Sequence, residues 1–162
     1  MTTVDIAFLL NGRPVSLSVE PRLLLSDALR HHLGMTSAHV GCEQGVCGVC
    51  TILLDGAPAR SCLMLAVMAD GHSVTTAEGL ADPRAEQLRD SFQEHHALQC
   101  GFCTPAMLLT AHCLLSAHPE AGETQIREAL SGNLCRCTGY QFIIDAVSSL
   151  TARGGEGDAS HG

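Results

Sequence analysis

Four cysteines in the first half of the chain have the spacing of an iron–sulfur ligand set. Cys42, Cys47 and Cys50 follow the pattern C-x4-C-x2-C, and eleven residues separate Cys50 from Cys62. A [2Fe–2S] cluster needs four thiolates, two for each iron, and plant-type ferredoxins supply them from a short loop and one distant residue. Three glycines lie between and beside the loop ligands: Gly41, Gly45 and Gly48. They let the loop wrap closely and leave backbone N–H groups free to donate to the cluster. The pattern predicts a [2Fe–2S] site and fits structural zinc poorly, since zinc usually binds two short Cys-x-x-Cys knuckles.

A second group of four cysteines lies near the C-terminus. Cys100 and Cys103 form C-x2-C, and Cys135 and Cys137 form C-x-C after a further thirty-one residues. Both pairs fall at expected helix boundaries, where a helix N-terminus favours thiolates. A four-cysteine zinc site remains an alternative for this group alone. Beside the first group, the pattern favours a second [2Fe–2S] cluster.

The remaining potential ligands have no paired spacing. Cys113 stands alone in an apolar segment, which predicts a small buried hydrophobic residue. The chain has nine histidines, and histidine replaces cysteine in Rieske centres, but eight cysteines already suffice for two clusters. We therefore expect the histidines to be surface or core residues. His39, three positions before Cys42, is the one that could lie beside a cluster.

The elements that position the first group are predicted to be strands. Apolar residues alternate on both sides of Asn11-Gly12, which indicates a β-hairpin. Helical spacing follows from Leu24 to Leu33, and Gly34 is a plausible stop. Short strands are expected at Thr51–Leu54 and Ser73–Thr76. This order predicts a small sheet with one covering helix.

Helices are predicted from about Pro83 onward. Thr104-Pro105 reads as a cap and first turn, followed by an apolar helix to Ala117 that should form the centre of this half. Shorter helices are expected at Gln125–Leu130 and Gln141–Leu150. We predict a sheet domain over residues 1–80, a helical domain over 81–153 and a disordered tail over 154–162.

The composition excludes several classes of protein. Nine basic residues, all arginine, oppose 17 acidic ones, and the formal net charge of −8 argues against nucleic acid or an anionic membrane as partner. No apolar run reaches the length of a membrane-spanning helix, and no signal peptide is visible, which predicts a cytoplasmic protein without membrane insertion. Nine cysteines in that setting indicate metal or redox chemistry and not a disulfide framework.

Three segments resemble one family over most of the chain. They are G-C-E-Q-G-V-C-G-V-C-T (41–51), Q-C-G-F-C-T-P (99–105) and G-N-L-C-R-C-T-G-Y (132–140). Their sequence and order resemble the iron–sulfur small subunit of the xanthine dehydrogenase, aldehyde oxidase and aerobic carbon monoxide dehydrogenase family of molybdenum hydroxylases. The resemblance implies an α+β fold in which an N-terminal ferredoxin-like β-grasp domain precedes a C-terminal four-helix-bundle domain that binds the second [2Fe–2S] cluster.

The resemblance also implies cofactors and partners. A large subunit would carry a molybdopterin-bound molybdenum centre, and a medium subunit would carry FAD, in a dimer of heterotrimers. Gln99 and Cys137 match family positions that contact the pterin. For Arg136 two roles stay open: pairing with a pterin phosphate or partner carboxylate, or charge compensation of a reduced cluster.

These features together predict a non-catalytic electron-transfer subunit of an oxidoreductase. Electrons from molybdenum would pass through both clusters to FAD or another acceptor, and the chain alone would turn over no organic substrate. The alternatives are a zinc-stabilised interaction module and a redox sensor that responds to cluster loss. The sequence selects neither the substrate nor the terminal acceptor, because the substrate pocket would belong to the large subunit.

Overall fold

The N-terminal strands pair around Asn11-Gly12 as their alternation predicts. In the computed structural model, which describes residues 2–151, β1 (Val4–Leu10) and β2 (Arg13–Val19) are antiparallel neighbours. Alternate side chains of β1 are buried, beginning with the third residue of the strand. Both turn residues have positive φ, as this kind of two-residue hairpin turn requires.

Three further strands complete a mixed sheet. β3 (Thr51–Leu54) pairs antiparallel with β4 (Ala57–Arg60) and with β5 (Ser73–Thr75), and β5 runs parallel to β1. The strand order is β2-β1-β5-β3-β4. The sequence prediction missed β4, which contains Pro58. Proline is tolerated there because β4 is an edge strand.

The covering helix is shorter than predicted, and most of it is a π-helix and not an α-helix. It begins as α1 (Leu25–Asp27) and continues as a π-helical segment, Ala28–His32, in which the Leu33 amide donates to the carbonyl five residues earlier. Gly34 ends it with a positive φ, as predicted. Leu25, Ala28 and Leu29 are fully buried and join the apolar core under the sheet.

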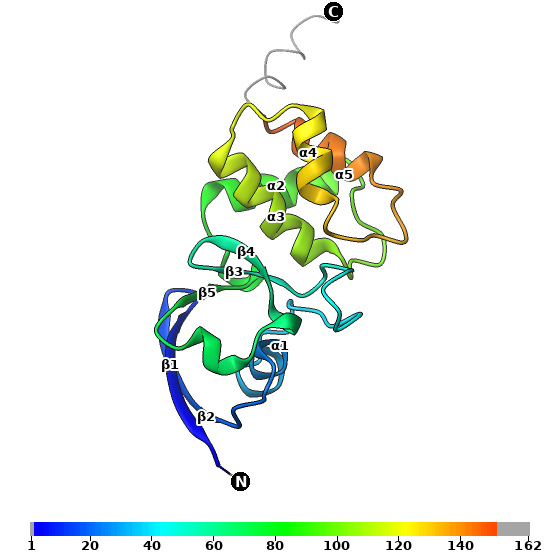
Figure 1. Ribbon diagram of the computed structural model, residues 1–162. Helices are drawn as coiled ribbons and strands as arrows, with labels where there is room; N and C mark the ends of the chain where they lie inside the picture. The colour runs from blue at the N-terminus through cyan, green and yellow to red at the C-terminus, as the bar shows by residue number, and fades with distance from the viewer. Residues whose placement is uncertain (1, 152–162) are drawn as a thin grey trace, which may run out of the picture.

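Four helices make up the second half of the chain. They are α2 (Pro83–Glu94), α3 (Thr104–Ala117), α4 (Glu123–Leu130) and α5 (Gln141–Ser148). As predicted, the apolar α3 is central: it packs against α2, α4 and the sheet strands β3 and β4. Figure 1 shows these helices as a separate layer above the sheet, with the first cysteine loop between the two halves.

The predicted cap of α3 is wrong. Thr104 is the first helical residue, and its predecessor, Cys103, holds the N-cap position with helical dihedral angles. The Thr104 amide already donates to the Gly101 carbonyl, so the turn begins before the threonine. Its buried hydroxyl has no hydrogen-bond partner among the described residues.

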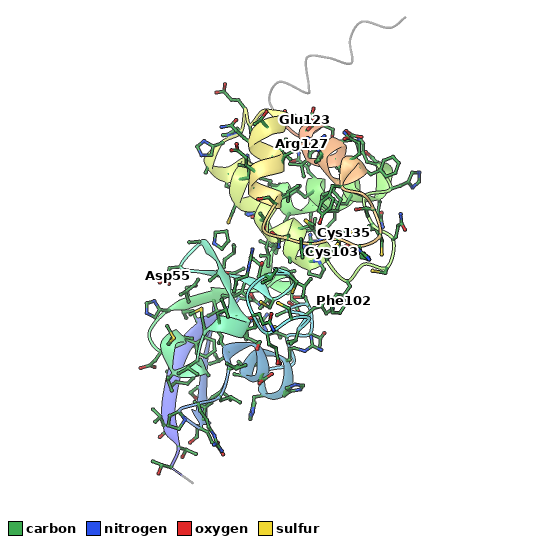
Figure 2. The ribbon with its side chains drawn as sticks, turned by 45° about the vertical axis from the view of Figure 1, so that its right-hand side comes forward. Asp55, Phe102, Cys103, Glu123, Arg127 and Cys135 are labelled. Carbon is green, nitrogen blue, oxygen red and sulfur yellow. The ribbon has the colours of Figure 1, made fainter. Side chains whose placement is uncertain are left out.

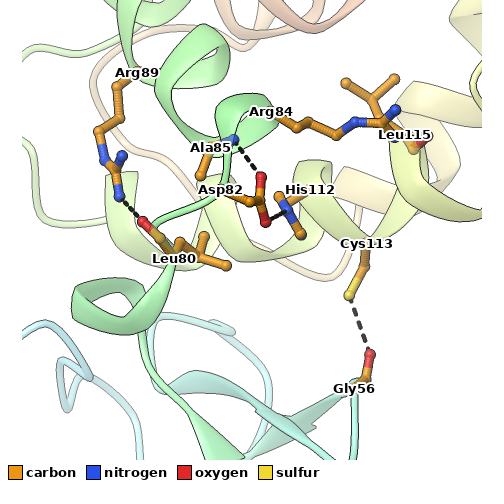
Figure 3. A network of polar contacts seen from close by, with 9 residues as sticks. All are labelled: Gly56, Leu80, Asp82, Arg84, Ala85, Arg89, His112, Cys113 and Leu115. Atoms are coloured by element: carbon orange, nitrogen blue, oxygen red, sulfur yellow. Dashed lines mark hydrogen bonds and ion pairs between the residues drawn. The ribbon is translucent and has the colours of Figure 1, made fainter. Parts of the chain in front are cut away.

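The connection between the halves is fixed by side chains on α2 and α3 (Figure 3). Asp82 accepts a hydrogen bond from the Ala85 amide at 2.9 Å and lies 2.7 Å from His112 Nε2. Arg89 donates to the Leu80 carbonyl. Cys113, half-buried, lies at the junction with its thiol 3.4 Å from the Gly56 carbonyl oxygen, outside both cysteine groups.

The expected fold class is confirmed: a ferredoxin-like sheet half with one covering helix precedes a bundle of four helices. The predicted disordered tail over residues 154–162 lies outside the described residues. Within the described part of the chain, no helix combines the length and the apolar character needed to cross a bilayer.

Candidate functional site

The sheet-half site, as we call Cys42, Cys47, Cys50 and Cys62, is built from one loop and one short helical turn. The first three cysteines lie in the loop that leads into β3, and Cys62 lies in a 3-10 turn, Ser61–Leu63, directly after β4. The Ser61 hydroxyl donates to the Cys50 carbonyl at 2.8 Å and thereby ties the distant residue to the loop. Cys50 and Cys62 are buried, whereas Cys42 and Cys47 are partly exposed.

The helical-half site, Cys100, Cys103, Cys135 and Cys137, is formed where two loops meet at the ends of helices. Cys103 precedes α3, and Cys135 and Cys137 lie between α4 and α5. The sulfur atoms of Cys100 and Cys137 are 3.5 Å apart. Figure 2 shows Cys103 next to Cys135 at the junction of the two halves. All eight cysteines predicted as ligands are thus brought into two groups, in the combination that their spacing predicts.

Within each group the thiols lie in pairs. Cys42 lies beside Cys47, and Cys50 beside Cys62; in the other group Cys100 lies beside Cys137, and Cys103 beside Cys135. No three Cys, His, Asp or Glu side chains of residues 2–151 gather as the ligands of a single ion would. Two pairs of thiols per group fit a cluster of two irons, each with two thiolates.

Backbone donors prepare the sheet-half site for a negatively charged ligand set. The amides of Cys47 and Gln44 both point at the Cys42 sulfur, each at 3.4 Å. These hydrogen bonds lower the pKa of the Cys42 thiol to about 6. Burial, together with the adjacent Cys50 thiol, instead raises the pKa of Cys62 to about 11. A buried thiolate of this kind needs a neighbouring positive charge, which bound iron would supply.

The helical-half site shows the same contrast. Burial and the neighbouring Cys135 raise the pKa of Cys103 to about 12. Burial acts on Cys135 in the same direction, but hydrogen bonds from Thr138 lower its pKa overall. The Thr138 hydroxyl lies 3.1 Å from the Cys135 sulfur, and the Tyr140 hydroxyl accepts from the Cys135 amide at 2.9 Å. The sequence prediction gave neither Thr138 nor Tyr140 a role, although both lie in the third motif.

One hollow adjoins both sites. It has a volume of about 580 Å³, and six of the predicted ligands line it together with apolar side chains. Phe102 and Leu134, on its wall, are 46% and 48% exposed. His39 stacks on Phe102 with ring centroids 4.4 Å apart, and its Nδ1 lies 2.7 Å from the Phe102 carbonyl oxygen. His39 therefore lies near both cysteine loops and links them.

The residues predicted to contact a pterin lie on the surface of this chain. Gln99 and Cys137 are exposed, as is Arg136 between the two ligands Cys135 and Cys137. Their placement leaves them free to meet a neighbouring subunit, and their role remains a prediction.

The two halves match two family models. Residues 8–80 match a 2Fe-2S iron–sulfur cluster binding domain, and residues 76–148 match a [2Fe-2S] binding domain. The chain is 52% identical over 155 residues to the caffeine dehydrogenase subunit gamma of Pseudomonas sp. (strain CBB1), which covers 93% of each chain. It is 51% identical to the nicotine 6-hydroxylase small subunit of Paenarthrobacter nicotinovorans, over 89% of this chain and 87% of the relative.

Solved structures give the same result. The structure superposes on a chain of quinoline 2-oxidoreductase from Pseudomonas putida 86 with a TM-score of 0.87 and 52% identity, over 96% of this chain and 98% of that one. Aldehyde oxidoreductase from Desulfovibrio gigas matches with a TM-score of 0.84 and 38% identity, over 94% of this chain and 17% of that longer chain.

The two family matches establish the cofactors of this chain. Two [2Fe–2S] clusters are the cofactors of the chain. The relatives are named as subunits of two dehydrogenases and one hydroxylase. The chain belongs to the iron–sulfur small subunits of the xanthine dehydrogenase and aldehyde oxidase family, and it is a non-catalytic electron-transfer subunit of an oxidoreductase complex.

Proposed function

We propose that the chain relays single electrons from the molybdenum centre of a large subunit to FAD on a medium subunit or to another acceptor. The route runs through the helical-half site and then through the sheet-half site. Bound iron–sulfur clusters supply the one-electron chemistry. The residues of the chain hold the clusters, limit access of water and donate hydrogen bonds to their sulfur ligands.

The observation that carries this proposal is the direct contact between the two cysteine loops. The Leu134 amide, next to Cys135, donates to the Cys47 carbonyl at 2.8 Å, and both sites adjoin one hollow. A single hydrogen bond between two peptide groups thus connects the loops of the two sites, and an electron would pass from one site to the other across this contact. The exposure of Gln99 and Cys137 supports the order of the route, because it leaves the helical-half site open to the large subunit.

The assembly we propose has a large molybdopterin-binding subunit, a medium FAD-binding subunit and this small subunit, as a dimer of heterotrimers in the cytoplasm. Within the chain we propose a domain boundary between residues 80 and 81. The eight cysteines are the proposed cluster ligands, and Gln99 and Cys137 the proposed pterin contacts.

The substrate class we propose is an N-heterocyclic compound. Relatives that share about half of their residues with this chain are named for caffeine, nicotine and quinoline, all of which contain ring nitrogen. Assay of the purified complex against these three compounds and an aldehyde tests this. Turnover of the aldehyde alone would contradict it.

The relay is tested by removing one cluster from the complex. Two [2Fe–2S] clusters predict four irons and four acid-labile sulfides per chain. In a Cys103→Ser variant we expect substrate to no longer reduce the sheet-half cluster, although dithionite still does. Cys113→Ser, which changes a half-buried thiol outside both sites, should behave like the wild type.

Electron paramagnetic resonance of each reduced sample provides the measurement. Unimpaired reduction of the sheet-half cluster by substrate in Cys103→Ser would refute the relay. Zinc without sulfide would instead favour the interaction module, and a stable chain without molybdenum-containing partners would favour the redox sensor.

A further inference from the structure

A buried amide joins the two cysteine-bearing loops. Asn133, two residues before Cys135, is only 1% exposed. Its Nδ2 donates to the Gly48 carbonyl at 3.0 Å and to the Thr51 hydroxyl at 3.2 Å, and its Oδ1 accepts from the Thr110 hydroxyl at 3.0 Å. Both donors and the acceptor of the side chain are therefore used. One residue of the helical half thus holds the first cysteine loop and α3 together.

Arg60 completes this network from the sheet half. Its guanidinium donates to the Gly132 carbonyl at 2.6 Å and to the Thr51 hydroxyl. Thr51 in turn donates to the Gly48 carbonyl at 2.5 Å and is itself buried. The network, defined by Asn133, Arg60, Thr51 and Thr110, spans the junction of the two halves, and a charged donor strengthens it.

The backbones of the two cysteine-bearing loops are in close contact, with no space for a side chain between them at Gly48. Gly48 has a φ of +72°, and a Cβ atom there would collide with the Gly132 carbonyl oxygen. The neighbouring residues of the two loops are joined by the hydrogen bond described above, from the Leu134 amide to the Cys47 carbonyl. The Leu134 peptide group directly precedes the proposed ligand Cys135 and is hydrogen-bonded to the proposed ligand Cys47. A shift of the loop that contains Asn133 would therefore change the position of one ligand relative to the other.

We propose that Asn133 and Arg60 are positioning residues that set the distance and orientation between the two clusters, and with them the rate of electron transfer between sites. This inference rests on the proposed relay. One electron leaves the reduced helical-half cluster and arrives at the oxidised sheet-half cluster, and no bond is made or broken. Both electron tunnelling and the magnetic interaction of two reduced clusters depend steeply on their separation, so a displaced loop alters both.

A purely stabilising network would have a different signature. Ser91 provides the comparison, because it is buried and its hydroxyl donates to the Ala146 carbonyl at 2.8 Å, wholly within the helical half. Loss of either network removes buried hydrogen bonds. Of these two networks, only the one at Asn133 spans the two sites, so of the two losses only that of Asn133 should change how the sites interact.

The test compares Asn133→Ala with Ser91→Ala in the whole purified complex. Both variants are checked for four irons and four sulfides per chain, fully reduced with dithionite and examined by cryogenic electron paramagnetic resonance. We expect Asn133→Ala to retain both cluster signals but to show a smaller interaction splitting and slower electron transfer between the clusters. Ser91→Ala should keep the wild-type splitting.

An unchanged splitting in a fully loaded Asn133→Ala complex would overturn the inference, and so would an equal loss in Ser91→Ala. If Asn133→Ala does not retain both clusters, the Arg60→Gln variant is measured in its place. That substitution removes the charged donor from a partly buried position at the edge of the network. An unchanged splitting in Arg60→Gln would also overturn the inference. Failure of the wild-type complex to contain two clusters would instead overturn the proposed function.

Discussion

Thr138 is the residue whose side chain acts most directly on a proposed ligand. Its hydroxyl donates to the Cys135 sulfur at 3.1 Å, and such bonds stabilise the more negative, reduced state of a cluster. Thr138→Val should therefore lower the reduction potential of the helical-half cluster, by roughly 40 mV for each 1 kcal/mol of hydrogen-bond energy lost. Thr138→Ser, which keeps the hydroxyl, should stay near the wild type. A redox titration followed by electron paramagnetic resonance measures both, and equal potentials in Val and wild type would contradict this role.

At the residue scale, the sequence predicts which cysteines gather better than it predicts the contacts around them. The cysteines are recognisable because the geometry of a cluster imposes local spacing. Asn133 acts on Gly48, which lies 85 positions earlier, and Arg60 acts on Gly132, 72 positions later. No local pattern encodes such contacts, which exist only once the two halves pack together.

Asp82 shows how one side chain fixes the start of an element. It caps α2 by accepting from the Ala85 amide. Asp82→Ala should cost about 1 kcal/mol in free energy of unfolding, measured by thermal denaturation at neutral pH.

Burial opposes ionisation of Asp82, but the Ala85 amide and His112 lower its pKa overall. The lowered pKa means that the contribution is present above the unfolded pKa of about 4 and is lost as pH falls through the folded value. The two proteins should therefore converge in stability in acid, whereas the exposed Asp90→Ala should differ little from wild type at any pH.

The elements themselves follow the sequence where local rules decide. The Asn11-Gly12 hairpin and the apolar α3 form where alternation and helical periodicity predict them. The edge strand β4 was missed because its short sequence, with Pro58, has no strand pattern of its own and pairs only because β3 lies beside it. The prediction of Thr104 as the N-cap of α3 failed for a similar reason. The Thr104 amide donates to the Gly101 carbonyl, so a turn that precedes the threonine already begins the helix.

At the scale of the whole molecule, the clusters should act as clamps. Each site draws its ligands from two segments of the chain, and a group that binds only the folded state stabilises it. Binding at a thousandfold excess over Kd contributes about 4 kcal/mol, or roughly 10 °C in Tm for a chain of this size. Anaerobic removal of iron by a chelator should lower Tm by about this amount in differential scanning calorimetry, both in the wild type and in Cys113→Ser. Equal Tm values with and without iron would contradict clamping.

The exposure of Cys100 and Cys137, whose sulfur atoms lie 3.5 Å apart, has a consequence for how the complex is made. A newly synthesised, iron-free chain exposes both thiols to solvent, within reach of oxidation to a disulfide. A docked large subunit would shut the entrance through which iron and sulfide must come. In the proposed assembly, iron and sulfide should therefore enter before the large subunit docks, and without air.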